Sequence, residues 1–319
     1  MQLLLRANNI IRNRSTILVV DKEQSGQRLD NFLFNKLKNI PKSHIYKMLR
    51  SGEVRINKKR IKPLYKLQFN DFLRIPPFWV DTIVKNKPSC NLIKLLLDAI
   101  IFEDSKLLVV NKPSGIPSHG GSGINFGVIE ILREARNDLK KLELVHRLDR
   151  DTSGCLILAK KKSVLRELHK LISERKMFKK YVLLVKGKWR GDELMVSLPL
   201  FKNQLVSGER IVIVSDKGKD STTIFRPLKI YKDFSLLEAE PKTGRTHQIR
   251  VHASHIGYPV VGDDKYGNSK FNSLMKQFGL KRLFLHACQV SFVWQGGREN
   301  NFVANLDIKL INILEKLFV

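Results

Sequence analysis

The sequence of 319 residues is poor in cysteine and has no long hydrophobic run. Its three cysteines, Cys90, Cys155 and Cys288, lie too far apart to form the close pairs of disulfide frameworks or zinc sites. No apolar stretch approaches the roughly 20 residues that a membrane-spanning helix needs. Arg6 interrupts the apolar run Leu3–Leu5 too early for a secretory signal peptide. We therefore expect reduced cysteines, with Cys155 in the core, and a cytoplasmic protein with no membrane partner.

Acidic residues are also scarce, because 30 Asp and Glu stand against 58 Lys and Arg, for a formal net charge of +28. A field of that sign favours polyanionic partners such as nucleic acid. The composition is rich in Lys, Asn and Ile throughout, so net charge alone does not prove such binding. The distribution is stronger support, since residues 1–80 hold 17 Lys and Arg against 5 Asp and Glu.

The spacing of apolar residues predicts two domains and an α+β fold. Two short helices, at 28–38 and from Pro41 to Gly52, and a small sheet form a compact first domain. In the second domain strands outnumber helices and regular crossover helices are missing, which favours a mixed, mainly antiparallel sheet. The expected divisions are an N-terminal extension at 1–20, a small domain at 21–80, a linker at 81–91 and a large domain at 92–319.

A basic face is predicted on the small domain. Between Pro41 and Lys66 the only acidic residue is Glu53. A run of charge is usually a solvated surface, but the near absence of acids favours a surface that binds phosphates. The residues of this basic face are Lys42, Lys47, Arg50, Arg55, Lys58, Lys59 and Arg60.

The densest group of reactive side chains is the run His146–Gly154, in which Asp149 lies between Arg147 and Arg150. Apolar residues on both sides indicate a strand, a sharp loop and a buried strand, so a rigid sheet would hold Asp149 still. One interpretation is a surface ion pair between Asp149 and a neighbouring arginine. The other is a carboxylate that reacts with a negatively charged substrate.

Two further elements accompany this run. Tyr181 opens an apolar strand, and a turn at Thr243–Arg245 leads into a predicted helix that carries Arg250. Three histidines follow this turn at 247, 252 and 255, but their spacings do not fit a zinc site. The Gly-rich segment His119–Gly123 lacks the spacing of a loop that binds nucleoside triphosphates.

The run His146-Arg147-Leu148-Asp149, followed by Thr152-Ser153-Gly154, resembles the signature of the RluA-type pseudouridine synthases of ribosomal and transfer RNA. Lys179–Gly187 and Gly244–Arg250 match two more elements of that family in the same order. The segment Arg28–Ile61 is similar to the S4 RNA-binding domain. This resemblance implies a small S4-like domain, a catalytic domain of the pseudouridine-synthase type, and a reaction that needs no metal and no organic cofactor.

The resemblance also implies a role for each site residue. Asp149 would be the catalytic carboxylate and Arg250 the cation that holds it ionised. Tyr181 would stack beneath the uracil and move a proton late in the reaction. The target base must leave the RNA stack to be reached, so Arg147 would fill the gap it leaves, and His146 would orient the loop at the RNA.

The resemblance extends to the RNA substrate. Asn57–Pro63 and Phe126–Glu130 are similar to family members that modify the large ribosomal subunit. They imply 23S ribosomal RNA, or an assembly intermediate of the large subunit, as the partner. We expect the enzyme itself to be a monomer. Which uridines are modified does not follow from the sequence.

Two other functions are compatible with parts of the sequence. The first is an RNA-binding assembly factor whose enzymatic site has lapsed, although Asp149, Tyr181 and Arg250 are all present. The second is a metal-dependent nuclease that uses Asp149, Asp151 and the histidines. It predicts that RNA is cut and that a chelator stops the activity.

Overall fold

The computed structural model describes residues 10–13, 15–37, 40–81, 87–121, 126–204, 210–294 and 296–318. The chain forms two compact units, Met1–Asn86 and Lys87–Val319, each of which is described by itself. The division falls inside the expected linker, of which residues 82–86 lie outside the described part. The large unit begins before residue 92, because helix α3 already starts at Cys90. Among the described helices none combines the length and apolar character needed to cross a membrane.

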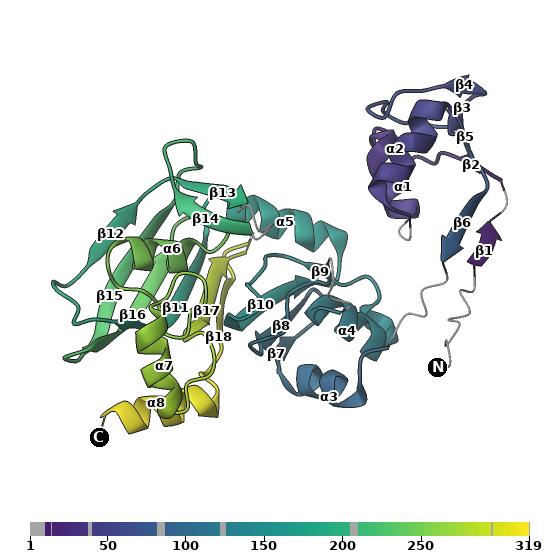
Figure 1. The fold of residues 1–319 in the computed structure, drawn as a ribbon. Coiled ribbons are helices and arrows are strands. Elements are labelled where there is room, and N and C mark those ends of the chain that lie inside the picture. Colours follow the sequence, from purple (N-terminus) through teal and green to yellow (C-terminus); the bar gives the residue numbers. More distant parts are fainter. Residues whose placement is uncertain are drawn as a thin grey trace, which may run out of the picture. The chain divides into compact units, whose positions relative to one another are not determined.

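The small unit combines two helices with short strands (Figure 1). Its elements are β1 (Ile10–Asn13), β2 (Thr16–Val19), α1 (Leu29–Lys36), α2 (Lys42–Ser51), β3 (Arg55–Ile56), β4 (Lys59–Arg60), β5 (Phe72–Ile75) and β6 (Phe78–Asp81). One sheet has the order β2-β5-β3-β4, and β1 pairs with β6. We expected an N-terminal extension up to residue 20. In the structure β2 pairs with β5, so the residues from Thr16 onward belong to this sheet. Residues 1–9 and 14 of that extension lie outside the described part.

Local signals set the bounds of α2 and of the hairpin that follows it. Ile45, Met48 and Leu49 form the buried face of α2, and Gly52 ends the helix in the left-handed conformation at φ 76°. The two residues between β3 and β4, Asn57 and Lys58, also have positive φ, at 49° and 66°. A two-residue turn of this kind matches the twist of a hairpin.

The large unit is built on one mixed sheet (Figure 1). Its strands are β7 (Ile100–Glu103), β8 (Leu107–Lys112), β9 (Glu143–Leu144), β10 (Ser153–Ala159), β11 (Met177–Lys186), β12 (Leu194–Ser197), β15 (Thr222–Ile230), β16 (Phe234–Pro241), β17 (Leu285–Val293) and β18 (Glu299–Val303), with a separate hairpin of β13 (Leu200–Gln204) and β14 (Arg210–Val214). The central order is β12-β15-β16-β11-β17-β10-β8-β7. Among the described pairs only β10 and β17 run parallel, which confirms the predicted α+β fold with a mainly antiparallel sheet.

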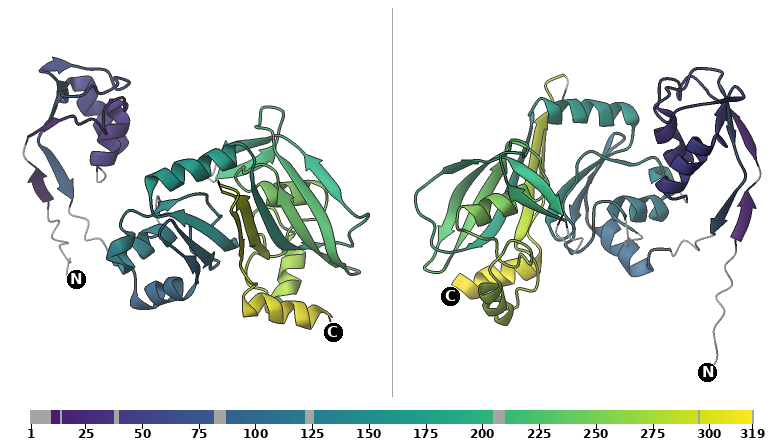
Figure 2. Two further views of the ribbon diagram at one scale, coloured as in Figure 1. Left: turned by 180° about the vertical axis from the view of Figure 1, so that it is seen from behind. Right: turned by 45° about the horizontal axis from the view of Figure 1, so that its top comes forward.

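Helices cover both faces of this sheet (Figure 1, Figure 2). They are α3 (Cys90–Asp98), α4 (Val128–Ala135), the short 3-10 helix η1 (Asn137–Leu139), α5 (Lys162–Ser173), α6 (Gln248–His255), α7 (Ser269–Gln277) and α8 (Ile308–Phe318). In the half of the sheet around β10, side chains alternate between the two faces. Cys155 and Ile157 pack in the core under α5, whereas Leu156 and Leu158 pack in the core with α3 and α4. Cys155 is fully buried, as predicted. In the other half, α6 covers one face while α7 and α8 cover the opposite one.

Gly154 determines how closely β10 and β17 approach. Its φ is +114°, and a Cβ at this position would lie 2.2 Å from the carbonyl oxygen of Ala287. Only glycine therefore allows the parallel pairing of Ser153 with His286 and of Gly154 with Ala287. We expected the turn after Asp149 to run through Gly154, but the bend ends at Asp151 and Ser153 already belongs to β10.

Candidate active site in the large unit

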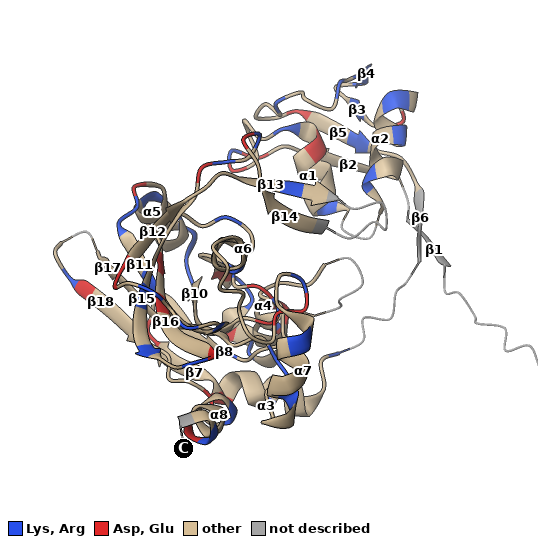
Figure 3. Cartoon of the chain, turned by 60° about the vertical axis from the view of Figure 1, so that its left-hand side comes forward, with Lys and Arg blue, Asp and Glu red and all other residues tan. Residues whose placement is uncertain are grey.

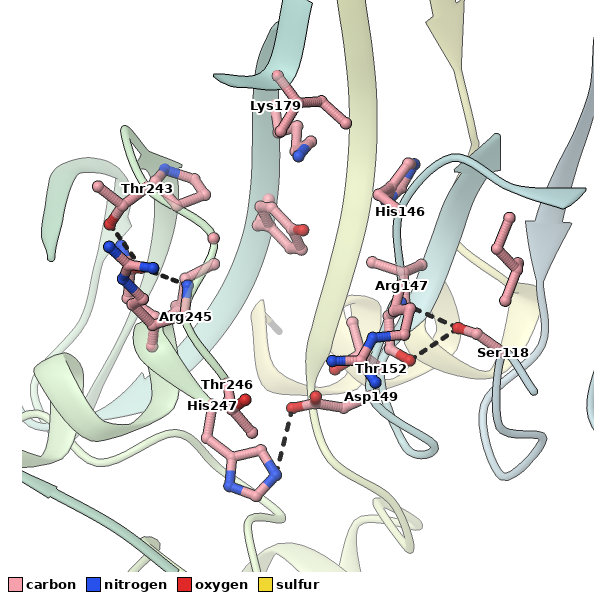
Figure 4. A pocket seen from close by; sticks show the side chains of 18 of the residues that line it. Ser118, His146, Arg147, Asp149, Thr152, Lys179, Thr243, Arg245, Thr246 and His247 are labelled. Atoms are coloured by element: carbon pink, nitrogen blue, oxygen red, sulfur yellow. Dashed lines mark hydrogen bonds and ion pairs between the residues drawn. The ribbon is translucent and has the colours of Figure 1, made fainter. Parts of the chain in front are cut away.

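A cleft of about 890 Å³ opens between the loop before β10, the strand β11 and the segment before α6 (Figure 4). Its size is within the range of sites that take small ligands. The five site residues predicted in this domain come from three separate parts of the chain, and the cleft gathers all five. They are His146, Arg147, Asp149, Tyr181 and Arg250.

Arg250 connects Asp149 to a second, buried carboxylate. Its Nη1 donates to Oδ2 of Asp149 at 3.2 Å, while Nε and Nη2 donate to the two carboxylate oxygens of Asp263 at 2.6 and 2.8 Å. The side chain of Asp263 is 0% exposed and that of Arg250 is 8% exposed, against 30% for Asp149. Asp263 therefore fixes the guanidinium from behind, and the third N–H bond is directed at the exposed carboxylate.

The charges of this triad stabilise one another. Burial by itself would lower the pKa of Arg250, but the hydrogen bonds and charge of Asp263, and then those of Asp149, raise it above its usual value. Burial alone would raise the pKa of Asp263. The hydrogen bonds from Arg250 and from the main-chain N–H groups of Tyr266 and Lys265 have the larger effect, so the pKa of Asp263 is lowered. Asp149 thus faces a permanent cation.

His247 approaches Asp149 from the other side. It precedes α6 in the left-handed conformation at φ 54°, which is strained for a residue other than glycine. The hydroxyl of Tyr266 accepts from the N–H of Val212 at 2.9 Å and lies 2.8 Å from Nδ1 of His247. This contact holds the ring in place, with Nε2 3.8 Å from Oδ2 of Asp149 (Figure 4). Burial lowers the pKa of His247, so the ring is neutral near pH 7.

Tyr181 lies where β11 shifts its register against β17. The shift falls between Lys180 and Tyr181, and it places Tyr181 opposite Ala287 and, on the other neighbour, Ala239. Such bulges re-aim a side chain at the edge of a site. Burial, and then the charge of Asp149, raise the pKa of the Tyr181 hydroxyl. Within the described residues this hydroxyl has no hydrogen-bond partner from the protein, which leaves it for a ligand.

The loop that carries Asp149 is fastened to the end of β8. Lys112 is fully buried, and its Nζ donates to three main-chain carbonyls, of which that of Arg150 is 3.0 Å away. Burial lowers the pKa of Lys112 to about 7. The three carbonyl acceptors oppose this effect, because they match the three protons of the charged ammonium group. The hydroxyl of Ser118 donates to the carbonyl of Leu148 and accepts from its N–H, both at 2.9 Å. These bonds fix the main chain on both sides of Asp149.

The other residues of the loop have separate roles. The ion pair of Asp149 is not made with Arg150, which instead pairs with Asp151 at 3.0 Å. Nε2 of His146 accepts from the N–H of Ile157 at 3.2 Å, and burial lowers the pKa of His146 to about 3. The neutral ring of His146 thus connects the loop to β10. Arg147 is exposed at the rim of the cleft.

The three histidines considered for a zinc site diverge. His247 faces Asp149 and Tyr266, His252 is buried against the hydroxyls of Ser221 and Thr223, and His255 is exposed. In the part of the chain that the structure describes, no three His, Cys, Asp or Glu side chains gather in an arrangement that would hold a metal ion.

All seven cations of the basic face lie exposed on α2 and on the β3–β4 hairpin (Figure 3). Within the described part of the small unit, no ion pair joins any of them to a carboxylate. Two have other contacts: Nε of Arg55 donates to the carbonyl of Gly52 at 3.1 Å, and Nζ of Lys42 lies 4.9 Å from the centre of the Phe34 ring. The face is therefore available to an external anion.

Sequence reasoning missed Asp263, Tyr266 and Lys112, and it considered His247 only as a metal ligand. Asp263 and Tyr266 lie in the polar turn 262–267, which directly follows the buried pair Val260-Val261. A polar turn after an apolar run is a usable signal for residues at the edge of a sheet. The sequence contains no signal that connects this turn to Asp149.

Comparison with known proteins agrees with this geometry. The family model described as RNA pseudouridylate synthase matches residues 106–255, and the S4 domain model matches residues 27–73. The chain belongs to the RNA pseudouridylate synthase family, which confirms the resemblance seen in the sequence.

Named relatives cover almost the whole chain. It is 49% identical to the ribosomal large subunit pseudouridine synthase C of Haemophilus influenzae over 97% of each chain. It is also 49% identical to the protein of that name in Escherichia coli K12, over 94% of this chain and 96% of that one. Among solved structures, human RNA pseudouridylate synthase domain containing 4 matches with a TM-score of 0.59 at 28% identity, over 72% of this chain and 96% of that chain.

Proposed function

We propose that this protein converts specific uridines of 23S ribosomal RNA, in the large subunit or in an assembly intermediate of it, to pseudouridine. The observation that carries the proposal is a carboxylate, Asp149, that a buried cation holds in a basic cleft. The names of the two bacterial relatives support the large ribosomal subunit as the source of the substrate. We place the enzyme in the cytoplasm, where bacterial ribosomes are assembled, and propose that it acts as a monomer.

The isomerisation exchanges one bond of the base for another. The bond between C1′ and N1 breaks, a bond between C1′ and C5 forms, and the proton lost from C5 is balanced by one gained at N1. Neither C1′ nor the edge of the ring is accessible within a helix, so the uridine must leave the stack. The carboxylate of Asp149 then attacks C1′, attacks C6, or removes a proton from C2′. The arrangement of the cleft is compatible with each of these routes.

The residues around Asp149 have complementary tasks in this proposal. Arg250 donates a hydrogen bond to the carboxylate and fixes its direction. Tyr181 stacks beneath the flipped uracil, and its hydroxyl transfers a proton late in the reaction. Arg147 takes the place of the base in the RNA stack, where a planar guanidinium stacks and also contacts phosphates. His146 holds the loop at the RNA.

The basic face of the small unit supplies affinity in the same proposal. Seven exposed cations without carboxylate partners in the described residues provide contacts to phosphates. Such contacts add affinity and are independent of base sequence. The small unit thus holds structured RNA while the large unit carries out the reaction.

The first experiment replaces the carboxylate. Purified Asp149→Ala and wild-type protein are incubated with large-subunit RNA from cells that lack the gene, and pseudouridines are mapped. We expect no product from the variant and RNA affinity within a few-fold of wild type, because the carboxylate reacts but does not bind phosphates. Asp151→Ala is the matched control, since the Asp151 side chain is 43% exposed and, among the described residues, its ion pair is with Arg150.

Three outcomes separate the alternatives. Pseudouridine formed by Asp149→Ala at the wild-type rate contradicts the proposed role of the carboxylate. Wild-type protein that binds RNA but forms no pseudouridine supports a lapsed assembly factor. RNA cleavage that excess chelator abolishes supports a nuclease.

A further inference from the structure

A second, smaller cavity of about 400 Å³ adjoins the cleft. It lies between the β13–β14 hairpin, the turn 215–219 that follows β14, and the segment 244–246. We call it the hairpin groove. Its lining is Arg147, Leu200, Phe201, Lys202, Val212, Lys217, Gly218, Lys219, Gly244, Arg245 and Thr246. Of these, Arg147 and the segment 244–246 also line the cleft, so the two cavities share a wall.

Five of the lining residues are cations, and none is acidic. They are Arg147, Lys202, Lys217, Lys219 and Arg245, and all five are exposed. Among the described residues no ion pair joins any of them to a carboxylate. The acidic residues Asp216 and Asp220 flank the lysines in sequence but do not line the groove. The groove is therefore a concentrated positive site that no acidic side chain of its own lining neutralises.

The turn that carries two of these lysines is held rigidly. The N–H of Gly218 donates to the carbonyl of Ser215 at 2.7 Å, and Leu200 and Lys219 exchange two main-chain bonds at 2.9 Å. A Cβ on Gly218 would lie 2.5 Å from the main chain of Leu200, so only glycine lets the turn lie this close to β13. The cations are thus set on a fixed frame before any ligand arrives.

The groove also offers apolar surface to a flat ligand. Leu200 and Val212 are buried beneath it, whereas Phe201 is 39% exposed although it is a large aromatic residue. An exposed ring beside lysines is the combination that binds single-stranded nucleic acid, because bases stack on the ring and phosphates contact the cations. A volume of about 400 Å³ suits a single nucleotide rather than a duplex.

We propose that the hairpin groove binds the nucleotide next to the target uridine in the substrate strand. This inference rests on the proposed function, because the cleft must hold the flipped uridine. An RNA strand that leaves the cleft past Arg147 and the segment 244–246 enters the groove directly, since these residues line both cavities. Phe201 stacks on the neighbouring base, and Lys217 and Lys219 contact its phosphates. The groove therefore adds affinity for the strand beside the target, whatever base the neighbouring nucleotide carries.

The test uses the full-length protein and RNA substrates that carry one target uridine. Phe201→Ala is combined with RNAs in which the base before or after the target is removed. We expect roughly a tenfold or larger loss of RNA affinity for Phe201→Ala on intact RNA, and a similar loss for wild type on one of the two abasic RNAs. On that RNA the variant and wild type are expected to be equal, because the stacked pair is then already missing.

The contribution of charge is measured separately. The double variant Lys217→Ala/Lys219→Ala is expected to raise the RNA concentration for half-maximal rate about tenfold and to reduce the slope of log affinity against log salt by about 2. The control is Lys309→Ala/Lys316→Ala on α8, which removes the same charge from exposed positions that line neither cavity. Thermal unfolding of all variants shows that the fold is retained.

The inference is overturned if both abasic RNAs affect wild type and Phe201→Ala equally, or if the two double variants behave alike. It is also overturned if a free nucleoside monophosphate binds the groove at the same time as the RNA substrate. Failure of the proposed function is distinguishable, because wild-type protein would then form no pseudouridine in any RNA.

Discussion

Arg250 in the cleft and the seven cations of the basic face carry the same charge in opposite settings. Arg250 is 8% exposed and donates to two carboxylates, whereas the cations of the basic face are exposed and, among the described residues, lack carboxylate partners. A buried charge with fixed partners sets geometry, and its loss leaves another charge without a partner. Exposed charges act additively and at a distance, so each of them is replaceable. Variants at the two places should therefore fail in different ways.

The largest effect is expected from Arg250→Ala. The variant leaves Asp263, whose side chain is 0% exposed, without its cation, which should reduce the free energy of unfolding by about 3–5 kcal/mol. Activity should fall at least about 100-fold, because Asp149 loses the group that directs it. Urea unfolding and single-turnover rates measure the two effects, and an unfolding free energy within about 1 kcal/mol of wild type would show that Asp263 does not depend on Arg250.

The pH dependence of this loss has a definite sign. The pKa of the Asp263 carboxyl is lower in the folded wild type than in the unfolded chain. Its ionised form therefore adds stability at pH values above the pKa that this carboxyl has when unfolded. That stability is lost as pH falls through the pKa that it has when folded. In Arg250→Ala the buried carboxyl is unpaired and is more easily protonated. The stability gap between wild type and variant should therefore narrow as pH falls, first through the raised pKa of this carboxyl in the variant and then through its lowered pKa in wild type. A constant gap would contradict this account.

A smaller effect is expected from Tyr266→Phe. The change removes the hydroxyl that accepts from Val212 and lies 2.8 Å from Nδ1 of His247, and should cost about 1–3 kcal/mol because the partners are left unsatisfied. The ring of His247 then loses the contact that holds it beside Asp149, so activity should fall while RNA affinity stays constant. Nitrogen NMR reports the state of the ring, and identical ring spectra in variant and wild type would show that Tyr266 does not control it.

The mildest effect on stability, and the clearest on salt dependence, is expected from the basic face. Replacing Lys58, Lys59 and Arg60 together by Ala should leave unfolding within about 0.5 kcal/mol of wild type, because all three are exposed. The slope of log affinity against log salt should fall by about 3, one for each lost phosphate contact. An unchanged slope would mean that the face only keeps the protein in solution.

The sequence predicted those features of the structure that neighbouring residues determine. It missed the features that depend on contacts between residues far apart in the chain. The end of α2 at Gly52 and the alternation along β10 follow from neighbouring residues. The partnership of Arg250 with Asp263 does not, because the fold alone decides which carboxylate meets a buried guanidinium. Gly154 illustrates the same limit, since a turn former by type proves to be a strand residue pressed against Ala287.

The start of the small sheet shows a further limit. Thr16–Val19 is a short run whose assignment depends on β5, a strand that comes much later in the chain. Family resemblance located Asp149, Tyr181 and Arg250 because it carries such distant information implicitly. It gave no account of the hairpin groove, whose lining comes from five separate runs of the chain.

The pairing of β10 with β17 also determines when the cleft exists during synthesis of the chain. Ser153 contacts His286, which is 133 residues further along, and Asp149 contacts Arg250 across 101 residues. The small unit is complete by residue 86, and domains generally fold in the order in which they leave the ribosome. On each growing chain we therefore expect the small unit to finish folding long before the carboxylate has its partners, and any RNA affinity of its basic face to precede the capacity to modify RNA.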